Sequence, residues 1–225
     1  MRAPTSVARF LIFCSASESF SSNESGSGTL PSNAFFVKPS ALFTKFPRLP
    51  INSELIGNLG NFINRALGFT KKAFDGKVPE TESFDEKDSE AEQKIKNLAA
   101  DMGSLMEQNH LDRALKKIME FSSFFNQYFQ HKAPWKNGPG TTNCVYLSVN
   151  AARALSIALF PFLPESSQKI WEQLGLDGEI NKSSWNDMSL LGISANHILG
   201  DASPIFAKVE ESDIEKHKSQ LGPSE

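Results

Sequence analysis

The sequence is poor in the residues that build disulfide frameworks and metal sites. Its 225 residues include two cysteines, Cys14 and Cys144, and four scattered histidines at positions 110, 131, 197 and 217. Two cysteines are too few for a disulfide framework and too isolated for a metal cluster. We therefore expect no bound metal and a reducing, intracellular environment, with the cytoplasm as the default compartment.

Sequence motifs of enzyme active sites are also missing. The chain has no Gly-rich phosphate-binding loop, no closely spaced cysteine pair and no His-Glu-x-x-His spacing. The string "HILG" at His197 lacks the second histidine and the strand–loop–helix setting of a nucleotide-binding His-Ile-Gly-His motif. The acidic run "ETESFDEKDSE" is typical of a solvated helix start. We predict no catalytic residue and no cofactor in this chain.

The charge and hydropathy pattern restricts the partners. A net charge of −3 gives no general attraction to nucleic acid or to acidic membrane. No apolar run is long enough to cross a bilayer, and the longest candidate, "ALSIALFPFLP", is interrupted by Pro161 and Pro164. We expect neither a membrane nor DNA as a partner, so any RNA contact must come from a local patch.

Residues 1–50 are rich in Ser, Pro and Phe and show no helical period. Such a segment is expected to form little stable structure. Its first twenty residues weakly resemble an organellar transit peptide. Because transit peptides avoid acids and Glu18 and Glu24 follow closely, a disordered leader is the preferred interpretation and targeting the alternative.

From residue 51 onward, the spacing of apolar residues predicts helices. They are expected at about 53–76, 85–107, 109–134, 142–160 and 164–175. Ser53 is the expected cap of the first, and Thr142 or Asn143 that of the fourth. An extended segment at 197–209 and a short polar helix at 212–221 follow. The prediction is an all-α antiparallel bundle of about five helices over 51–190, then a C-terminal fold-back segment over 191–225.

The first predicted helix carries an unusual polar stripe. Asn61 and Arg65 lie one turn apart on it, although asparagine is a poor helix former for an exposed face. Together they offer a donor and an acceptor for a base edge and a planar cationic fork. An ordinary solvated stripe explains the same residues, and the pattern alone favours that interpretation.

A second stretch, "NQYFQHKAPWK", ends the third predicted helix at Pro134. It leaves Trp135 in a loop between Lys132 and Lys136. A loop tryptophan between two cations suits single-stranded RNA, because an unstacked base lies on the indole while the cations meet phosphates. The alternative is a tryptophan folded back as a lid on the bundle.

Four blocks of the chain stand out together. They are "NSELIGNLGNFINRALGFTKKAFDGKVPE", "FNQYFQHKAPWK", "ALSIALFPFLPESSQKIWEQLG" and the tail "HILGDASPIFAKVE". In this order, spanning about residues 51–221, they resemble the anticodon-binding domain and closing segment of methionyl-tRNA synthetases. The family's closing segment is usually His-x-Ile/Leu-Gly followed by Pro-Leu-Phe.

The resemblance implies a function for the two stretches. In that family an Asn and an Arg of the first bundle helix, and a Trp after Ala-Pro, read the CAU anticodon. By position they fall on Asn61, Arg65 and Trp135 here. Pro134 would aim the ring, and Asn126, within the family's Asn-x-Tyr pattern, would help to hold the pocket. The implied partner is the anticodon loop of methionine tRNA.

The family's catalytic signatures, His-Ile-Gly-His and Lys-Met-Ser-Lys-Ser, are absent. ATP, and zinc where it is used, would therefore bind a catalytic half that this chain lacks, and we expect the chain alone to be inactive. It could be the tail of a split gene, a subunit acting with a separate catalytic chain, or an RNA-binding orphan.

Two further hypotheses stay open from the sequence. A helical protein–protein module could have lost RNA binding and dock to a synthetase assembly. Alternatively, the chain could contribute to aminoacylation when supplied with a catalytic half. Pro204, Ile205 and Phe206 are expected to leave an apolar patch exposed as a docking surface.

Overall fold

The computed structural model describes residues 51–206. The predicted leader over 1–50 and the predicted short helix at 212–221 lie outside the described residues. The described part is all-helical, as predicted, and contains no strand. Its one β-type contact is an isolated antiparallel bridge between Lys77 and Ile198.

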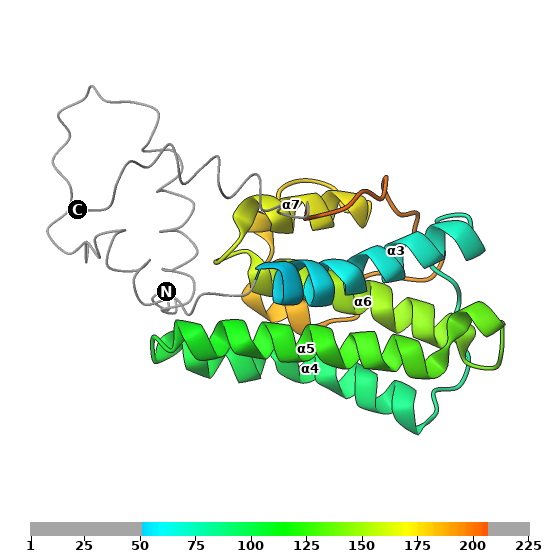
Figure 1. Cartoon of the computed structure of the whole chain (residues 1–225), viewed down its shortest axis with the longest axis horizontal. Coiled ribbons are helices and arrows are strands. Elements are labelled where there is room, and N and C mark those ends of the chain that lie inside the picture. The colour runs from blue at the N-terminus through cyan, green and yellow to red at the C-terminus, as the bar shows by residue number, and fades with distance from the viewer. Residues whose placement is uncertain (1–50, 207–225) are drawn as a thin grey trace, which may run out of the picture.

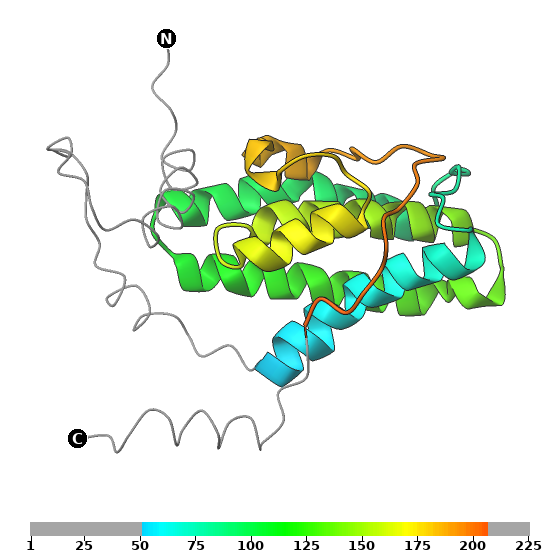
Figure 2. The same cartoon turned by 90° about the horizontal axis from the view of Figure 1, so that it is seen from above.

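The main helices form a bundle that is elongated along α4, α5 and α6 (Figure 1). In chain order they are α3 (Asn61–Ala73), α4 (Glu86–Glu107), α5 (Leu111–Lys132), α6 (Thr141–Leu159) and α7 (Pro164–Gln173). A π-helical segment, η1 (Ile51–Gly60), leads into α3, and short 3-10 turns lie at η2 (Pro134–Lys136), η3 (Ile180–Lys182) and η4 (Trp185–Ser189). Figure 2 shows α3 crossing the bundle at an angle.

Helix α6 is the centre of the bundle. Nearly all of its residues are buried, and it contacts α3, α4, α5 and α7. Its sequence combines Val and Leu with many Ala and Ser residues. A helix that is apolar nearly all round must be enclosed by its neighbours, and small side chains let those neighbours approach closely.

The helix starts agree with the sequence in one case and differ in two. Asp85 caps α4 and forms a capping box with Asp88, as the predicted start at residue 85 requires. The first helical segment instead begins at Ile51, ahead of Ser53, so Ser53 is not its cap. Helix α6 begins after Gly140, whose φ of 76° suits glycine. The predicted cap Asn143 lies inside α6.

The segment after η4 returns along the bundle as a strap. The Val78 amide donates to the His197 carbonyl at 2.9 Å and the Leu199 amide to the Gly76 carbonyl at 2.8 Å. The predicted exposed patch at residues 204–206 is wrong for two of its three residues. Pro204 is exposed, but Ile205 is buried in the core, and Phe206 is half-buried against Gly60. Burying these side chains removes apolar surface from water, so the strap stabilises the bundle.

Candidate nucleic-acid interface

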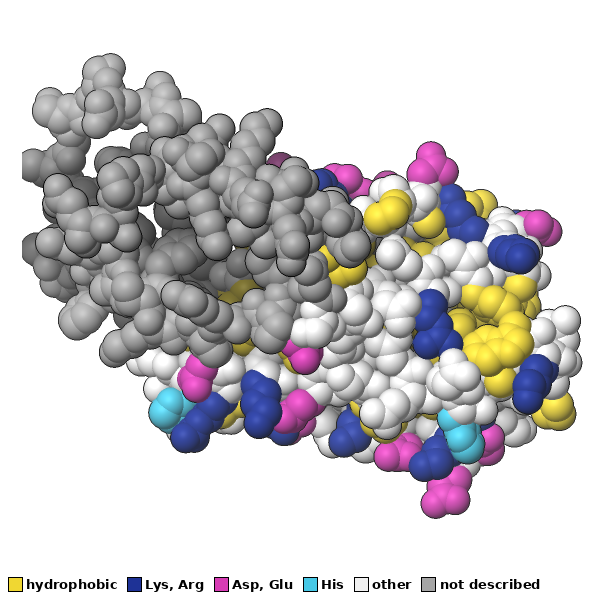
Figure 3. All heavy atoms as spheres, in the orientation of Figure 1, with side chains coloured by type: hydrophobic (Ala, Val, Ile, Leu, Met, Phe, Trp, Pro, Cys, Tyr) yellow, Lys and Arg dark blue, Asp and Glu magenta, His cyan; other side chains and the backbone are white. Residues whose placement is uncertain are grey.

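A groove of about 840 Å³ lies on the face built by η1, α3, α5 and the start of α4. Its lining is polar and includes Asn58, Asn61, Arg65, Ser123, Asn126, Gln127, Gln130 and His131. Figure 3 shows that this face is mostly uncharged, with hydrophobic side chains gathered at one end beside Lys or Arg. Such a surface can form hydrogen bonds and apolar contacts but attracts phosphates weakly.

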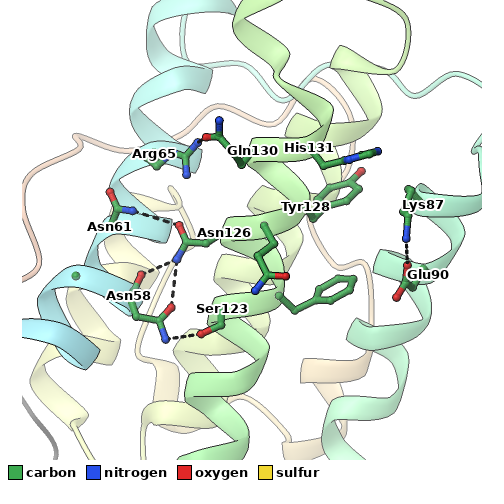
Figure 4. Close-up of a pocket in the computed structure, with 13 residues that line it drawn as sticks. Asn58, Asn61, Arg65, Lys87, Glu90, Ser123, Asn126, Tyr128, Gln130 and His131 are labelled. Atoms are coloured by element: carbon green, nitrogen blue, oxygen red, sulfur yellow. Dashed lines mark hydrogen bonds and ion pairs between the residues drawn. The ribbon is translucent and has the colours of Figure 1, made fainter.

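Three asparagines form a chain of hydrogen bonds across the floor of this groove (Figure 4). The Asn61 amide donates to Asn126 Oδ1 at 3.3 Å, and Asn126 Nδ2 donates to the Asn58 carbonyl at 2.9 Å. Asn126 lies on α5, whereas Asn58 lies on η1 and Asn61 at the start of α3. The amide of Asn126 therefore orients Asn61 and also satisfies a backbone acceptor.

Asn58 explains why the segment before α3 sits so close to α5. Its Nδ2 donates to Ser123 Oγ at 2.8 Å and to the Met119 carbonyl at 3.0 Å. Both partners lie on α5, more than sixty positions away in sequence. A poor helix former is kept here because its side chain joins two helices. The sequence did not predict this role for Asn58.

Arg65 lies between the groove and the loop after α5. Its Nη2 donates to Gln130 Oε1 at 3.0 Å. Its guanidinium carbon lies 5.0 Å from the centre of the Phe129 ring and 5.8 Å from that of Trp135. These distances are within the range of cation–π attraction. Arg65 therefore connects the polar groove with the rings of Phe129 and Trp135. Its partner Gln130 was not predicted from the sequence.

Trp135 is presented by a tight turn at the end of α5. Ala133 adopts a left-handed conformation, with φ of 43°, and its amide closes on the Phe129 carbonyl at 3.1 Å. Pro134 follows and is buried, so it supports the turn. The Trp135 side chain is 44% exposed and packs at 6.3 Å from the Phe129 ring. The indole is therefore supported from below and open to solvent above.

The two predicted flanking cations behave differently. Lys136 is exposed and has no ion pair within residues 51–206. The structure differs from the prediction for Lys132. Its Nζ contacts Asp85 Oδ2 at 2.6 Å and Asp88 Oδ1 at 2.5 Å, and its side chain is 7% exposed. Lys132 is thus turned inward and is not a free cation beside the indole.

Asp88 is the centre of a buried cluster that the sequence did not predict. Its carboxylate is 1% exposed and accepts hydrogen bonds from Tyr128 Oη at 2.7 Å and Asn143 Nδ2 at 3.0 Å as well as from Lys132. Burial, with the nearby carboxylates, raises the pKa of Tyr128. Burial opposes the charge of Lys132, but hydrogen bonds to Asp85 and Asp88 raise its pKa. The lysine therefore stays charged and the tyrosine neutral at neutral pH.

The described part of the chain contains no group of three or more His, Cys, Asp or Glu side chains placed to hold a metal ion. None of its helices combines the length and the apolar character that crossing a membrane needs.

Comparison with known proteins bears on the identity of the domain. Residues 78–225 match a family described as the anticodon-binding domain of methionyl tRNA ligase. This stretch contains Trp135 and Asn126, whereas Asn61 and Arg65 precede it.

Curated relatives extend the match. The methionine–tRNA ligase of Pyrococcus horikoshii is 41% identical over 170 residues, which cover 73% of this chain and 22% of that protein. The ligase of Pyrococcus abyssi is 39% identical over 173 residues, covering 74% of this chain and 23% of that protein. The chain thus spans less than a quarter of the length of these relatives.

Solved structures share the fold. Mycobacterium tuberculosis methionyl-tRNA synthetase bound by methionyl-adenylate superposes with a TM-score of 0.61 at 23% identity. The superposition covers 75% of this chain and 34% of that structure. Together with the helical bundle described above, these matches show that the chain belongs to the family of methionyl-tRNA ligase anticodon-binding domains.

Proposed function

We propose that this chain binds the anticodon loop of methionine tRNA, selects the sequence CAU, and supports methionine–tRNA ligation. One observation supports this most strongly. Asn61 and Arg65 line the groove, and the Arg65 guanidinium lies 5.8 Å from the exposed indole of Trp135. A base lying on the indole would place its edge within reach of that arginine.

Trp135 would act as the stacking platform. Its ring is backed by Phe129, which is buried, and so cannot retreat into the bundle. Stacking of an unpaired base on an aromatic side chain contributes about 1–3 kcal/mol. Because every base has a stacking face, this contact would supply affinity without selecting a sequence.

Asn61 and Arg65 would supply the selection. One N–H of the Asn61 amide donates to Asn126, which leaves the amide oxygen and the second N–H for a ligand. That oxygen can accept a hydrogen bond from the exocyclic amine of cytosine or adenine. Arg65 keeps further N–H groups for acceptors on a base. A wrong base would leave these groups unpaired, at a cost of about 1–3 kcal/mol.

The charge distribution favours contacts with the bases of the RNA over contacts with its phosphates. Lys132 is neutralised by two carboxylates, and Lys87 pairs with Glu90 at 3.0 Å on the far side of the groove. Lys136 remains exposed beside the indole. With few phosphate contacts, the affinity should depend only weakly on salt.

The test is titration of a stem-loop carrying CAU with the full chain and with Trp135→Ala. The matched control is Trp185→Phe, because Trp185 does not line the groove. Its indole donates instead to the Ala99 carbonyl of α4 at 3.1 Å. We expect Trp135→Ala to weaken binding roughly 5- to 150-fold, the equivalent of about 1–3 kcal/mol. The control should bind like the parent.

Equal binding by Trp135→Ala and the parent would contradict the proposal. If neither binds the stem-loop above background, the alternative of a protein–protein module that docks to a synthetase assembly is favoured instead.

A further inference from the structure

We infer that Asp88 is a positioning residue for Trp135. The buried cluster around its carboxylate fixes the turn that presents the indole, so a residue that never touches the ligand would control its affinity. The part of this inference that concerns RNA rests on the proposed function. The part that concerns the indole does not.

The cluster joins three of the helices that meet at this end of the bundle. Asp88 belongs to the first turn of α4, Tyr128 and Lys132 to the end of α5, and Asn143 to the first turn of α6. Asn143 also donates to the Ser83 carbonyl at 3.1 Å and accepts from the Glu82 amide at 2.8 Å, which holds the loop before α4. The Asp88 carboxylate contacts Tyr128 and Lys132 of α5 and Asn143 of α6. It therefore links α4 directly to both other helices.

The turn that carries Trp135 begins and ends beside this cluster. It leaves α5 after Lys132 and enters α6 at Gly140. A Cβ atom added to Gly140 would lie 3.3 Å from Lys132 Nζ, so the ammonium group sits between the two ends of the turn. A displaced Lys132 ammonium would therefore disturb the packing between those two ends.

The conformation of the turn needs such support. Ala133 and Asn137 both adopt left-handed backbone angles, with φ of 43° and 51°. This conformation is unfavourable for alanine and persists only where the surroundings impose it, whereas asparagine tolerates it. Inside the turn the Lys136 amide donates to the Ala133 carbonyl at 2.9 Å. Local bonds of this kind also form in other turn types, so they do not select this one.

Removing the charge of Asp88 should release the turn. In Asp88→Asn, Lys132 would keep Asp85, whose side chain is 62% exposed and so holds it weakly. The strained Ala133 would then relax, and the indole would leave its contact with Phe129 and Arg65.

The first experiment follows the indole N–H of Trp135 in a ¹H–¹⁵N spectrum of the full chain without RNA. Trp171 and Trp185 are internal references, since the chain has three tryptophans. In Asp88→Asn we expect the Trp135 signal to shift or broaden while the other two stay in place. The control is Asn150→Ala, which removes a buried side chain bonded to Ile193 on the strap and should leave Trp135 unmoved.

The second experiment is a double-mutant cycle with the CAU stem-loop. Asp88→Asn should weaken binding about 3- to 10-fold in the parent and less than about 2-fold when Trp135 is already alanine, because both changes act through one contact. Lys132→Met removes the same ion pair from its other partner and should give the same result. It replaces Asp88→Asn in both experiments if Asp88→Asn does not fold.

Two outcomes would overturn the inference. One is a Trp135 signal unchanged in both the Asp88→Asn and Lys132→Met chains. The other is an equal loss of affinity from Asp88→Asn with and without the Trp135 indole. A displaced indole signal, combined with unchanged RNA binding by Trp135→Ala, would uphold the positioning role and contradict the proposed function.

Discussion

Replacing Asn126 by alanine should lower both the stability of the fold and its affinity for RNA. The side chain accepts from Asn61 at 3.3 Å and donates to the Asn58 carbonyl at 2.9 Å and to Asn58 Oδ1 at 3.2 Å. The change removes the bonds that tie α5 to η1, each of which contributes about 0.5–1.5 kcal/mol net. The bond to Asn61 is longer and exposed, so it contributes less to stability than the bond to the carbonyl. We expect the free energy of unfolding to fall by about 1–2 kcal/mol.

The effect on affinity has a separate origin. Without Asn126 the amide of Asn61 can rotate freely, and binding must then order it. Fixing such a side chain costs about 0.5–1.5 kcal/mol, which corresponds to a loss of affinity of roughly 2- to 12-fold.

The assay combines urea unfolding followed by circular dichroism with titration of a CAU stem-loop. Asn97→Ala is the matched control, because Asn97 is an exposed asparagine of α4 outside the groove. Its unfolding free energy should stay within about 0.5 kcal/mol of the parent. The reasoning is refuted if Asn126→Ala matches Asn97→Ala in both measurements, since the amide chain would then neither hold the segment nor orient Asn61.

Three other changes test different parts of the structure. Gly200→Ala should destabilise the chain by about 1–3 kcal/mol in urea unfolding, because its Cβ would lie 2.2 Å from the Glu172 carbonyl oxygen; Gly68→Ala, with nothing within 4 Å, should be neutral or stabilising. The hydrogen bond from Lys132 lowers the pKa of Asp85, so its contribution is present above the ordinary value of about 3.9 and is lost as pH falls further. Stability of Asp85→Asn, measured from pH 6 to pH 2, should therefore fall less than that of the parent, and parallel curves would contradict this. Burial raises the pKa of Cys144 to about 12, so a folded chain carrying Cys14→Ser should not react with a thiol reagent at pH 8 until it is unfolded.

Local signals in the sequence predicted the elements that local chemistry determines. Helix α4 starts after Asp85 and α5 ends before Pro134, as predicted, and the structure adds a capping box between Asp85 and Asp88. The polar stripe of Asn61 and Arg65 lies on the groove, where Asn126 contacts Asn61.

Contacts between distant residues were not predictable in this way. The sequence placed Lys132 beside Trp135 as a free cation, but its ammonium is bound by Asp88, 44 positions earlier. The π-helical segment before α3 depends on Asn58 reaching α5, which no local pattern encodes. The burial of Ile205 likewise depends on where the strap meets the bundle, which no local pattern encodes.

The central claim is that this domain selects the anticodon through Asn61, Arg65 and Trp135. The most direct measurement is the affinity of the full chain for two stem-loops of equal length at one salt concentration, one carrying CAU and one carrying the same three bases permuted. The account predicts that the CAU stem-loop binds at least about tenfold more tightly, the equivalent of about 1.4 kcal/mol. Equal affinities for the two stem-loops would contradict it.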